Sequence, residues 1–472
     1  MSPYRWTIEK VMTATDGRLV CGSAQLDLAG IAIDSRTVLP DQLFVAIAGE
    51  SHDGHRFIAQ VLDSGVKGVV VADAQVSNLP LERMRTEGVA CVRVPDTTRA
   101  LGDLARFNRR RGGVKVVAVT GSNGKTSTRM LMELVIGQTF VVLATSGNMN
   151  NHIGLPLTLF RLGPAHHAAV LELGMNHAGE IDTLGRICEP DVGVITNVGP
   201  AHLEGLGSID NVARAKGELL GTIRAGGTAV LNGDDPRVAA LGQPLDCPVV
   251  YFGTGPDAQV RAESIRLTAM GMTFVLVTPS GSVPVRLATP SRVMVGNALA
   301  AAAAGEILGV SLDRIQRGLE RFEPQVGRMG IRRLGHDIRL IDDTYNANPA
   351  SMLAAIETLA ALRGESRTIA VLGDMLELGE ASSALHHKVG ERVGQLDIDR
   401  LFVTGTFADS VAAGALGRRM PASGIFSGSQ AEITAELCRQ LAPGDLVLVK
   451  GSRGMAMERV VEAVCRWAQD ER

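Results

Sequence analysis

The chain carries a glycine-rich loop, Thr120-Gly-Ser-Asn-Gly-Lys-Thr-Ser127, between a predicted buried strand at Val114–Thr120 and a helical pattern at Ser127–Ile136. Glycines in such a loop let backbone N–H groups surround phosphate oxygens, and the start of the helix adds partial positive charge. Lys125 would reach the terminal phosphates of a nucleotide, and Thr126 would offer its hydroxyl to Mg²⁺. The usual spacing places a further glycine at position 119, which is valine here, so the loop is the shorter G-x-x-G-K-T form. The loop predicts an α/β fold. It also predicts that the protein hydrolyses ATP or GTP or transfers a phosphate from one of them.

Strand and helix patterns alternate over most of the chain, which is typical of a doubly wound, mostly parallel sheet. At about 150 residues per domain, the 472 residues predict about three domains. We expect a small α/β domain at 1–95, a central domain with the loop at 96–326, and a Rossmann-like domain at 327–472. The last domain lacks a G-x-G-x-x-G after its first strand, so dinucleotide binding is not indicated. The run Arg109-Arg-Arg-Gly-Gly113 is expected to be a break between a helical pattern that begins at Thr97 and the strand at Val114–Thr120. The further buried strands expected in the central domain are Ala168–Leu173, Val192–Asn197, Thr228–Asn232 and Pro248–Phe252.

Composition excludes several classes of partner. Lys plus Arg total 47 and Asp plus Glu total 50, a net charge of −3, so no overall positive field attracts nucleic acid or an anionic membrane. The most apolar stretch, Val293–Val310, is mostly alanine and holds Asn297 and Glu306, so we expect no membrane span. The N-terminus shows no secretory signal, and the six scattered cysteines form no C-x-x-C pair. We therefore expect a cytoplasmic protein with buried, reduced thiols.

Two polar residues follow neighbouring predicted strands and are candidate metal ligands. Glu172 follows the strand that begins at Ala168, and His202 follows the strand that begins at Val192. The carboxyl ends of parallel strands share one rim, and Mg²⁺ on a triphosphate typically takes one or two carboxylates besides phosphates and water. A single histidine is more often a surface or core residue than a ligand, but convergence with Glu172 and the loop favours a metal site. Lys216, taken alone, would be an exposed helix lysine.

A series of short motifs runs through nearly the whole chain. They are Thr120-Gly-Ser-Asn-Gly-Lys-Thr126, Gly147-Asn-Met-Asn-Asn-His-Ile-Gly-Leu-Pro156, Glu172-Leu-Gly-Met-Asn-His177, Asn197-Val-Gly-Pro-Ala-His202, Ala215-Lys-Gly-Glu218, Leu231-Asn-Gly-Asp-Asp235, Asn297-Ala-Leu-Ala-Ala301, Asp342-Asp-Thr-Tyr-Asn-Ala-Asn-Pro349, Gly373-Asp-Met-Leu-Glu-Leu-Gly379 and Lys450-Gly-Ser-Arg453. In content and order they resemble the ATP-dependent Mur ligases of peptidoglycan synthesis.

Several of these motifs are similar to those of the last-acting member of that family. They are Tyr345-Asn-Ala-Asn-Pro349, Gly373–Gly379 and, early in the chain, Asp34-Ser-Arg36, Leu43-Phe-Val-Ala46 and Asp53-Gly-His55. The Asp-Asn-Pro-Arg motif of the diaminopimelate-adding member is absent. One departure lies on the adenine side, where Ser291-Arg-Val293 stands in place of the family's usual Gly-x-His before Asn297.

The resemblance implies an enzyme that uses ATP and Mg²⁺ to join D-alanyl-D-alanine to UDP-N-acetylmuramoyl-tripeptide, a step in cell-wall synthesis on which cell shape and division depend. The terminal carboxylate of the tripeptide would become an acyl phosphate, which the dipeptide amine then attacks. Closure of the C-terminal domain on ATP would keep water from this intermediate.

The resemblance also implies residue roles. Catalysis would involve Lys125, Glu172, His202 and Lys216. ATP would be bound by Gly121, Ser122, Asn123, Gly124, Lys125, Thr126, Ser127, Asn297, Arg328, Asp343, Tyr345, Asn346 and Asn348. The metal ligands would be Thr126, Glu172, His202 and Lys216, with Lys216 carbamylated. The UDP-linked peptide would be bound by Ser35, Arg36, Asn148, Asn150 and Asn151.

Three other functions stay open at this point. The chain could be another Mur-type amide ligase, a phosphate-loop ATPase or GTPase switch without ligase activity, or a non-catalytic protein that recognises UDP-sugars. Folylpolyglutamate ligases share the loop but not Tyr345–Pro349. A switch would leave the motifs of 327–472 without purpose, and the intact Lys125, Glu172 and His202 argue against mere binding. The sequence does not decide between diaminopimelate and lysine as third residue of the tripeptide, and we expect a monomer.

Overall fold

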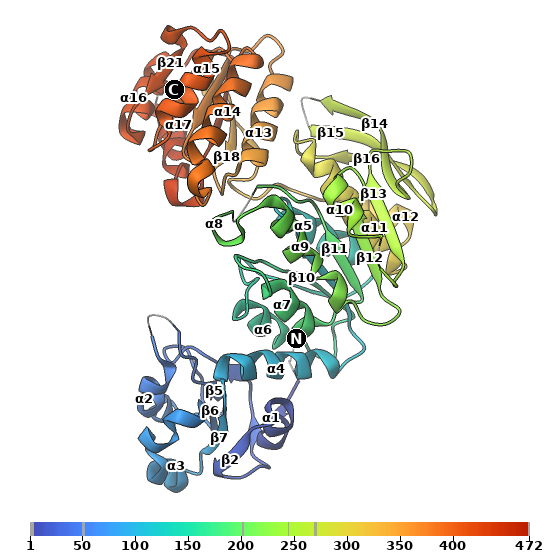
Figure 1. Ribbon diagram of the computed structural model, residues 1–472, viewed down its shortest axis with the longest axis vertical. Coiled ribbons are helices and arrows are strands. Elements are labelled where there is room, and N and C mark those ends of the chain that lie inside the picture. The colour runs from blue at the N-terminus through green and yellow to red at the C-terminus, as the bar shows by residue number, and fades with distance from the viewer. Residues whose placement is uncertain (1–3, 50–51, 201–202, 244, 269–270, 471–472) are drawn as a thin grey trace.

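The computed structural model describes residues 4–49, 52–200, 203–243, 245–268 and 271–470. In the described parts, the strands form one two-stranded ribbon and sheets of five, nine and six strands. Figure 1 shows three bodies stacked along the long axis, one around each of these larger sheets, in chain order from the blue N-terminal to the red C-terminal body.

The five-stranded sheet, in the order β2-β7-β6-β5-β4, is parallel except where β2 pairs antiparallel with β7. The ribbon joins β1 to β3. The elements of this part are β1 Trp6–Thr7, α1 Ile8–Thr15, β2 Arg18–Cys21, β3 Asp27–Leu28, β4 Ile31–Ala32, β5 Leu43–Val45, η1 Gly54–Phe57, α2 Ile58–Asp63, β6 Gly68–Ala72, η2 Asp73–Asn78, α3 Leu81–Glu87, β7 Ala90–Val94 and α4 Thr97–Arg110.

The nine-stranded sheet has the order β16-β15-β14-β13-β12-β11-β8-β10-β9 and is parallel from β9 to β14. Its last two pairs are antiparallel and form a meander whose central strand alternates buried and half-buried residues. The elements are β8 Lys115–Thr120, α5 Lys125–Ile136, β9 Val142–Ala144, α6 Gly154–Leu159, β10 Ala168–Glu172, α7 Glu180–Cys188, β11 Val192–Ile195, α8 Leu203–Leu206, α9 Ile209–Gly217, η3 Leu220–Thr222, β12 Thr228–Asn232, α10 Pro236–Ala240, β13 Val249–Gly253, β14 Val260–Thr268, β15 Gly271–Thr278, β16 Gly281–Leu287, α11 Val293–Ile307 and α12 Leu312–Glu320.

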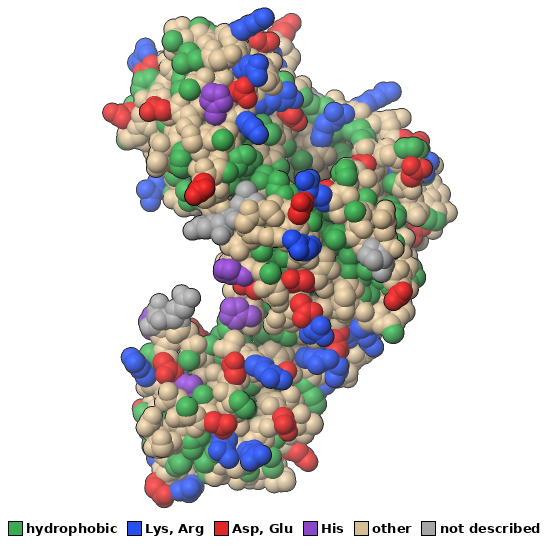
Figure 2. All heavy atoms as spheres, viewed as in Figure 1, with side chains coloured by type: hydrophobic (Ala, Val, Ile, Leu, Met, Phe, Trp, Pro, Cys, Tyr) green, Lys and Arg blue, Asp and Glu red, His purple; other side chains and the backbone are tan. Residues whose placement is uncertain are grey.

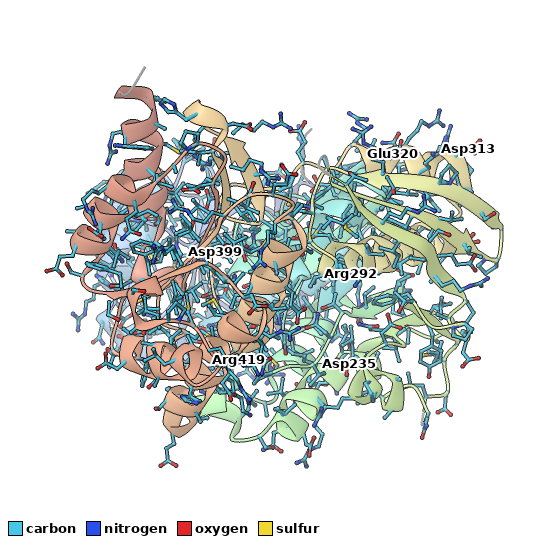
Figure 3. All side chains as sticks on the ribbon, turned by 90° about the horizontal axis from the view of Figure 1, so that it is seen from above. Asp235, Arg292, Asp313, Glu320, Asp399 and Arg419 are labelled. Carbon is cyan, nitrogen blue, oxygen red and sulfur yellow. The ribbon has the colours of Figure 1, made fainter. Side chains whose placement is uncertain are left out.

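The six-stranded sheet has the order β17-β18-β22-β19-β20-β21, and all pairs except β17 with β18 are parallel. Its elements are β17 Gly330–Arg333, η4 Gly335–Asp337, β18 Arg339–Asp343, α13 Pro349–Ala361, β19 Thr368–Leu372, η5 Gly379–Ala381, α14 Ser382–Gln395, β20 Arg400–Val403, α15 Ala408–Leu416, η6 Ala422–Gly424, β21 Ile425–Ser427, α16 Gln430–Gln440, β22 Leu446–Lys450, η7 Arg453–Met455 and α17 Glu458–Asp470. Seen from above, this body lies beside the central one, with Asp399 and Arg419 labelled on it and Arg292 and Asp235 on its neighbour (Figure 3).

The register of the central strands brings their carboxyl ends to one rim. Glu172 at the end of β10 lies opposite Val119 of β8, and Ile195 at the end of β11 lies opposite Thr120. The loop that follows β8 therefore leaves the sheet between its two neighbours, at the position where open α/β sheets hold ligands.

The first two sheets share one hydrophobic core that passes through α4. Leu101 and Leu104 of this helix are buried together with Val92 of the first sheet and Ala169 of the second. The predicted break is present at 111–114, but α4 extends further into the arginine run than predicted, to Arg110. Arg109 is 2% exposed, and its guanidinium donates hydrogen bonds to the carbonyl oxygens of Cys188, Val114 and Glu189. These acceptors satisfy the buried charge, so the helix continues to Arg110.

The predicted α/β class with a central, mostly parallel sheet and a C-terminal Rossmann-like part is confirmed. The antiparallel meander β14–β16 was not predicted, and α5 begins at Lys125 rather than at Ser127. All six cysteines are free, three of them buried and three half-buried. Within the described residues, no helix is both long and apolar enough to cross a membrane.

Candidate functional site at the phosphate loop

The phosphate loop is held in place by the segment that follows β11. Ser122 N–H donates to the Asn197 carbonyl at 3.0 Å, and Asn123 N–H donates to Asn197 Oδ1 at 2.8 Å. Thr196 Oγ1 in turn donates to the Asn123 carbonyl at 2.7 Å. These bonds fix the loop against the end of β11 through both backbone and side-chain atoms.

Two loop glycines have backbone angles that disfavour any other residue. Gly121 has φ +155° and Gly124 has φ +80°. A Cβ on Gly121 would collide with Thr196, and one on Gly124 would collide with the Asn297 amide of α11. The glycines therefore let the loop lie directly against its neighbours and leave its N–H groups free to face a ligand.

Lys125, the first residue of α5, is half-buried and points back over the loop. Its Nζ donates to the Gly121 carbonyl at 2.7 Å. Burial lowers the pKa of Lys125, Glu172 opposes that shift, and Arg328 adds to it. An ammonium placed here lacks full solvation, which favours its pairing with a phosphate.

Glu172 and Lys216 are buried beside Lys125. Glu172 is 3% exposed. Its Oε1 accepts a hydrogen bond from Asn150 Nδ2 at 2.9 Å, while Oε2 has no partner among the described residues. Lys216 is 1% exposed. Burial, and then the nearby Lys125, lower the pKa of Lys216 well below its ordinary value. The exposed helix lysine that a pattern alone would give is thus wrong, because α9 turns this side chain inward.

The described side chains around Lys125 supply only some of the oxygen ligands that a Mg²⁺ ion needs. Within them, no three His, Cys, Asp or Glu side chains converge on one point. The buried Glu172 with its unpartnered oxygen and the Thr126 hydroxyl offer two hard oxygen ligands, and a bound triphosphate would bring more. His202, the other predicted ligand, lies outside the described residues.

The segment 321–329, which joins α12 to β17, and the rim of the six-stranded sheet approach the phosphate loop from the other side. Asn348 Nδ2 donates to Asn123 Oδ1 at 2.6 Å, and Arg328 Nη2 donates to Thr126 Oγ1 at 3.2 Å. The Arg328 guanidinium also lies 3.9 Å from the centre of the Tyr345 ring. Two sheets remote in sequence therefore form one site.

A cavity of about 550 Å³ lies between these two sides. It is lined by twelve of the thirteen predicted ATP-binding residues, namely Ser122, Asn123, Gly124, Lys125, Thr126, Ser127, Asn297, Arg328, Asp343, Tyr345, Asn346 and Asn348. Gly121 is not part of the lining. Ser291 and Val293, from the segment that departs from the family pattern, also line the cavity.

Asp343 is not a free carboxylate. Its Oδ2 lies 2.6 Å from the buried Lys450 Nζ, and its Oδ1 accepts the Met329 N–H at 3.1 Å. Lys450 begins one of the motifs found in the sequence, but no role was predicted for it. The sequence pattern that could have indicated a role for this residue is a lysine at the end of an apolar strand, two residues before Ser452. Ser452 Oγ accepts the Leu376 N–H at 2.9 Å, so this motif fixes a further loop of the cavity wall.

The predicted peptide-binding residues are spread over three places. Asn150 and Asn151 line a second, larger cavity of about 1020 Å³ between α4 and α7. Asn148 is exposed, and neither cavity includes it. Ser35 and Arg36 lie on the turn after β4, where Arg36 and Asp34 form an ion pair at 2.7 Å. Hydrogen bonds from Arg36 lower the pKa of Asp34 to about 2.

Comparison with known proteins gives matches over nearly the whole chain. The family models described as "Mur ligase family, catalytic domain", "Mur ligase middle domain" and "Mur ligase, glutamate ligase domain" match residues 27–109, 119–305 and 327–453. The chain is 36% identical over 465 residues to the UDP-N-acetylmuramoyl-tripeptide--D-alanyl-D-alanine ligase of Escherichia coli (strain K12), covering 97% of this chain and 98% of that protein.

Two crystal structures extend the similarity to three dimensions. A structure of MurF from Acinetobacter baumannii superposes with a TM-score of 0.89 at 34% identity, covering 99% of this chain and 100% of that chain. The MurF ligase of Thermotoga maritima in complex with ADP superposes with a TM-score of 0.83 at 28% identity, covering 94% and 98%.

Proposed function

This chain belongs to the Mur ligase family, and we propose that it joins D-alanyl-D-alanine to UDP-N-acetylmuramoyl-tripeptide with hydrolysis of ATP to ADP and phosphate. One observation carries the proposal. The phosphate loop of the central sheet and the rim of the C-terminal sheet enclose one cavity, in which a nucleotide bound by one body would contact the other. A simple ATPase switch has no need of the second body.

Each body has its own task in this proposal. Residues 1–95 capture the UDP moiety through Ser35 and Arg36, residues 96–326 bind ATP and activate the peptide, and residues 327–472 close the site and hold the dipeptide. The protein acts as a monomer in the cytoplasm, where ATP and its nucleotide-linked substrate occur. Asn148, Asn150 and Asn151 guide the peptide towards Lys125.

ATP lies in the smaller cavity. The amides of Gly121–Ser127 surround its phosphates, and Lys125 neutralises charge on the γ-phosphate as it is transferred. Asn297 faces the adenine, while Arg328, Asp343 and residues 345–348 border the adenine and ribose. The Asp343 carboxylate pairs with Lys450 and accepts the backbone N–H of Met329. Asp343 therefore also holds in place the segment that carries Arg328, the neighbour of Met329.

A magnesium ion would be held by Thr126 and Glu172, with His202 and a carbamylated Lys216 as further ligands or supports. The unpartnered Glu172 Oε2 and the buried Lys216, whose pKa burial lowers, fit such a site, because an amine that gives up its proton can add CO₂ and become an anion. When bound, Mg²⁺ supplies charge neutralisation on the triphosphate.

The reaction needs two steps because a carboxylate is a poor electrophile. The terminal carboxylate of the tripeptide attacks the γ-phosphorus, the bond to ADP breaks, and an acyl phosphate forms. The free amine of D-alanyl-D-alanine then attacks the acyl carbon, phosphate leaves, and the amine loses a proton. The contacts between Asn348 and Asn123 and between Arg328 and Thr126 draw the two bodies together, which excludes water from the acyl phosphate.

Phosphate release measured with ATP, the UDP-linked tripeptide and D-alanyl-D-alanine, each omitted in turn, tests this function. We expect release only when all three are present, together with a pentapeptide product seen by mass spectrometry. Lys125→Ala should abolish turnover. Release that needs ATP alone would instead support an ATPase, and binding of the UDP compound without turnover would support a binding protein.

A further inference from the structure

The larger cavity is a groove whose wall belongs mainly to two helices. α4 contributes Arg99, Asp103 and Arg106, and α7 contributes Glu180 and Arg186. The two helices pack against each other. The groove reaches Lys125 and Asn150, so it opens into the phosphate site, and Figure 2 shows the surface hollowed between the N-terminal and central bodies.

Most charged side chains of the groove are already paired. Arg106 lies 2.7 Å from Glu189, and Arg186 lies 2.7 Å from Asp182. Glu180 accepts the backbone N–H groups of Asn176 and His177 at 2.6 and 3.2 Å. Each of these three groups therefore already has a hydrogen-bonded partner within the protein.

Arg99 and Asp103 are different. They lie one turn apart on α4, with Arg99 Nε 3.8 Å from Asp103 Oδ2, which is too long for a hydrogen bond. Neither side chain has a hydrogen bond to another residue in the described parts of the chain. Asp103 is 36% and Arg99 83% exposed at the side chain, and burial raises the pKa of the Asp103 carboxyl. The pair thus presents one negative and one positive group, side by side, to the groove.

We propose that Arg99 and Asp103 recognise the side chain of the third residue of the tripeptide and select diaminopimelate over lysine. This inference rests on the proposed function. For the terminal carboxylate of that residue to be phosphorylated it must lie at Lys125, at one end of the groove, and its side chain branches from there beside the peptide path that Asn150 and Asn151 line. Diaminopimelate ends in an ammonium and a carboxylate on one carbon, which match Asp103 and Arg99. Lysine ends in an ammonium alone and would leave Arg99 unpaired.

Rates of phosphate release with two synthetic substrates, the diaminopimelate and the lysine tripeptide, test this assignment. The wild-type protein should show a kcat/KM at least tenfold higher for the diaminopimelate form. Arg99→Gln should lower kcat/KM about tenfold or more for that form, mainly through KM, and leave the lysine form within about twofold. Asp103→Asn should lower both by about tenfold, because both substrates carry the ammonium.

Arg186→Gln is the matched control, since Arg186 lines the same groove but is bound to Asp182. It should leave both substrates within about twofold. Thermal melting of each variant reports folding. Equal losses with both substrates in Arg99→Gln, unchanged kinetics in Asp103→Asn, or a wild-type preference for lysine would each overturn the assignment. If the wild-type protein releases phosphate with neither tripeptide, the proposed function itself has failed, which is a different result from a change in preference.

Discussion

Asn348 Nδ2 donates a hydrogen bond of 2.6 Å to Asn123 Oδ1, across 225 residues of sequence. The first residue caps α13 of the C-terminal body, and the second lies in the phosphate loop. With the bond from Arg328 to Thr126, this contact makes the loop that would cradle phosphate also the place where the two bodies meet. In the proposed function, nucleotide binding and closure would therefore be coupled through the same few atoms.

Substitution of Asn348 separates its two tasks. Its Oδ1 accepts the Ser351 N–H as the helix cap, while its Nδ2 reaches Asn123. Serine is also a favourable cap but is too short to reach Asn123. For Asn348→Ser we expect a melting temperature within about 2 °C of wild type and a rise in KM for ATP of about three- to tenfold, since one hydrogen bond contributes about 1 kcal/mol.

Asn123→Ala removes the same bond from the other side and should raise KM for ATP by a similar factor. The double variant should be no worse than either single one, because the bond is lost only once. Multiplied losses in the double variant would mean that the two asparagines act separately.

Gly124 and Gly179 offer a matched test of the phosphate loop. Both cap helices with left-handed backbone, at φ +80° and +85°. A Cβ on Gly124 would collide with Asn297, whereas one on Gly179 would meet nothing within 4 Å. Gly179→Ala should cost about 1–2 kcal/mol of unfolding free energy. Gly124→Ala should cost more and should also raise KM for ATP at least tenfold.

Turnover assays and denaturant unfolding of both variants distinguish these effects. If Gly124→Ala and Gly179→Ala change KM for ATP equally, the collision with Asn297 has no bearing on the nucleotide site.

The sequence predicted the parts of the site that depend on strand order. Glu172 and the loop converge because parallel strands end at one rim, a rule that needs no knowledge of packing. The family resemblance inferred from the motifs is confirmed by the comparisons. In contrast, the Lys450 to Asp343 pair depends on the register of two strands far apart in sequence, and the Arg99 to Asp103 pair, although one helical turn apart, lines the groove only because α4 packs against α7.

Two further features of the fold were not predicted from the sequence for a similar reason. Arg109 was predicted to lie in a break, yet carbonyl groups of Val114, just before β8, and of Cys188 and Glu189 at the end of α7 accept hydrogen bonds from its guanidinium. The meander β14–β16 extends the sheet beyond the parallel strands, where its alternating residues give no continuous apolar run of the kind sought for buried strands. Both features depend on neighbours distant in sequence.

Acid should loosen the loop at residues 374–378, which forms part of the cavity wall. His386 is buried, its Nε2 accepts the Met375 N–H at 2.9 Å, and its Nδ1 lies 2.7 Å from the Ser382 carbonyl. Burial lowers the pKa of His386 below 6.5, although Ser382 and Asp374 oppose the shift. The unfolded chain therefore binds a proton first, so this group favours folding above about pH 6.5 and loses that contribution as the pH falls towards the folded pKa.

Protonated Nε2 can no longer accept from Met375, so the amide hydrogens of 374–378 should exchange faster below about pH 6.5 after correction for intrinsic rates. Hydrogen exchange with mass spectrometry measures this. In His386→Gln, whose amide can accept and donate at similar positions without titrating, the extra acid-dependent exchange should disappear. The same pH dependence in both proteins would assign it to another group.

Lys216 should carry a carbamate when the enzyme is active. Its amine is buried, and burial and the nearby Lys125 both lower its pKa, which favours the neutral amine that reacts with CO₂. We expect a carbamate signal in carbon NMR with ¹³C-bicarbonate in wild type and none in Lys216→Ala, whose turnover should fall by about 100-fold or more. A short carboxylate such as acetate should restore part of that activity by filling the vacated space.

Lys115→Ala, a control at an exposed lysine paired with Asp191, should keep wild-type turnover and the NMR signal. Full activity of Lys216→Ala in bicarbonate-free buffer would show that the enzyme needs neither the lysine nor its carbamate.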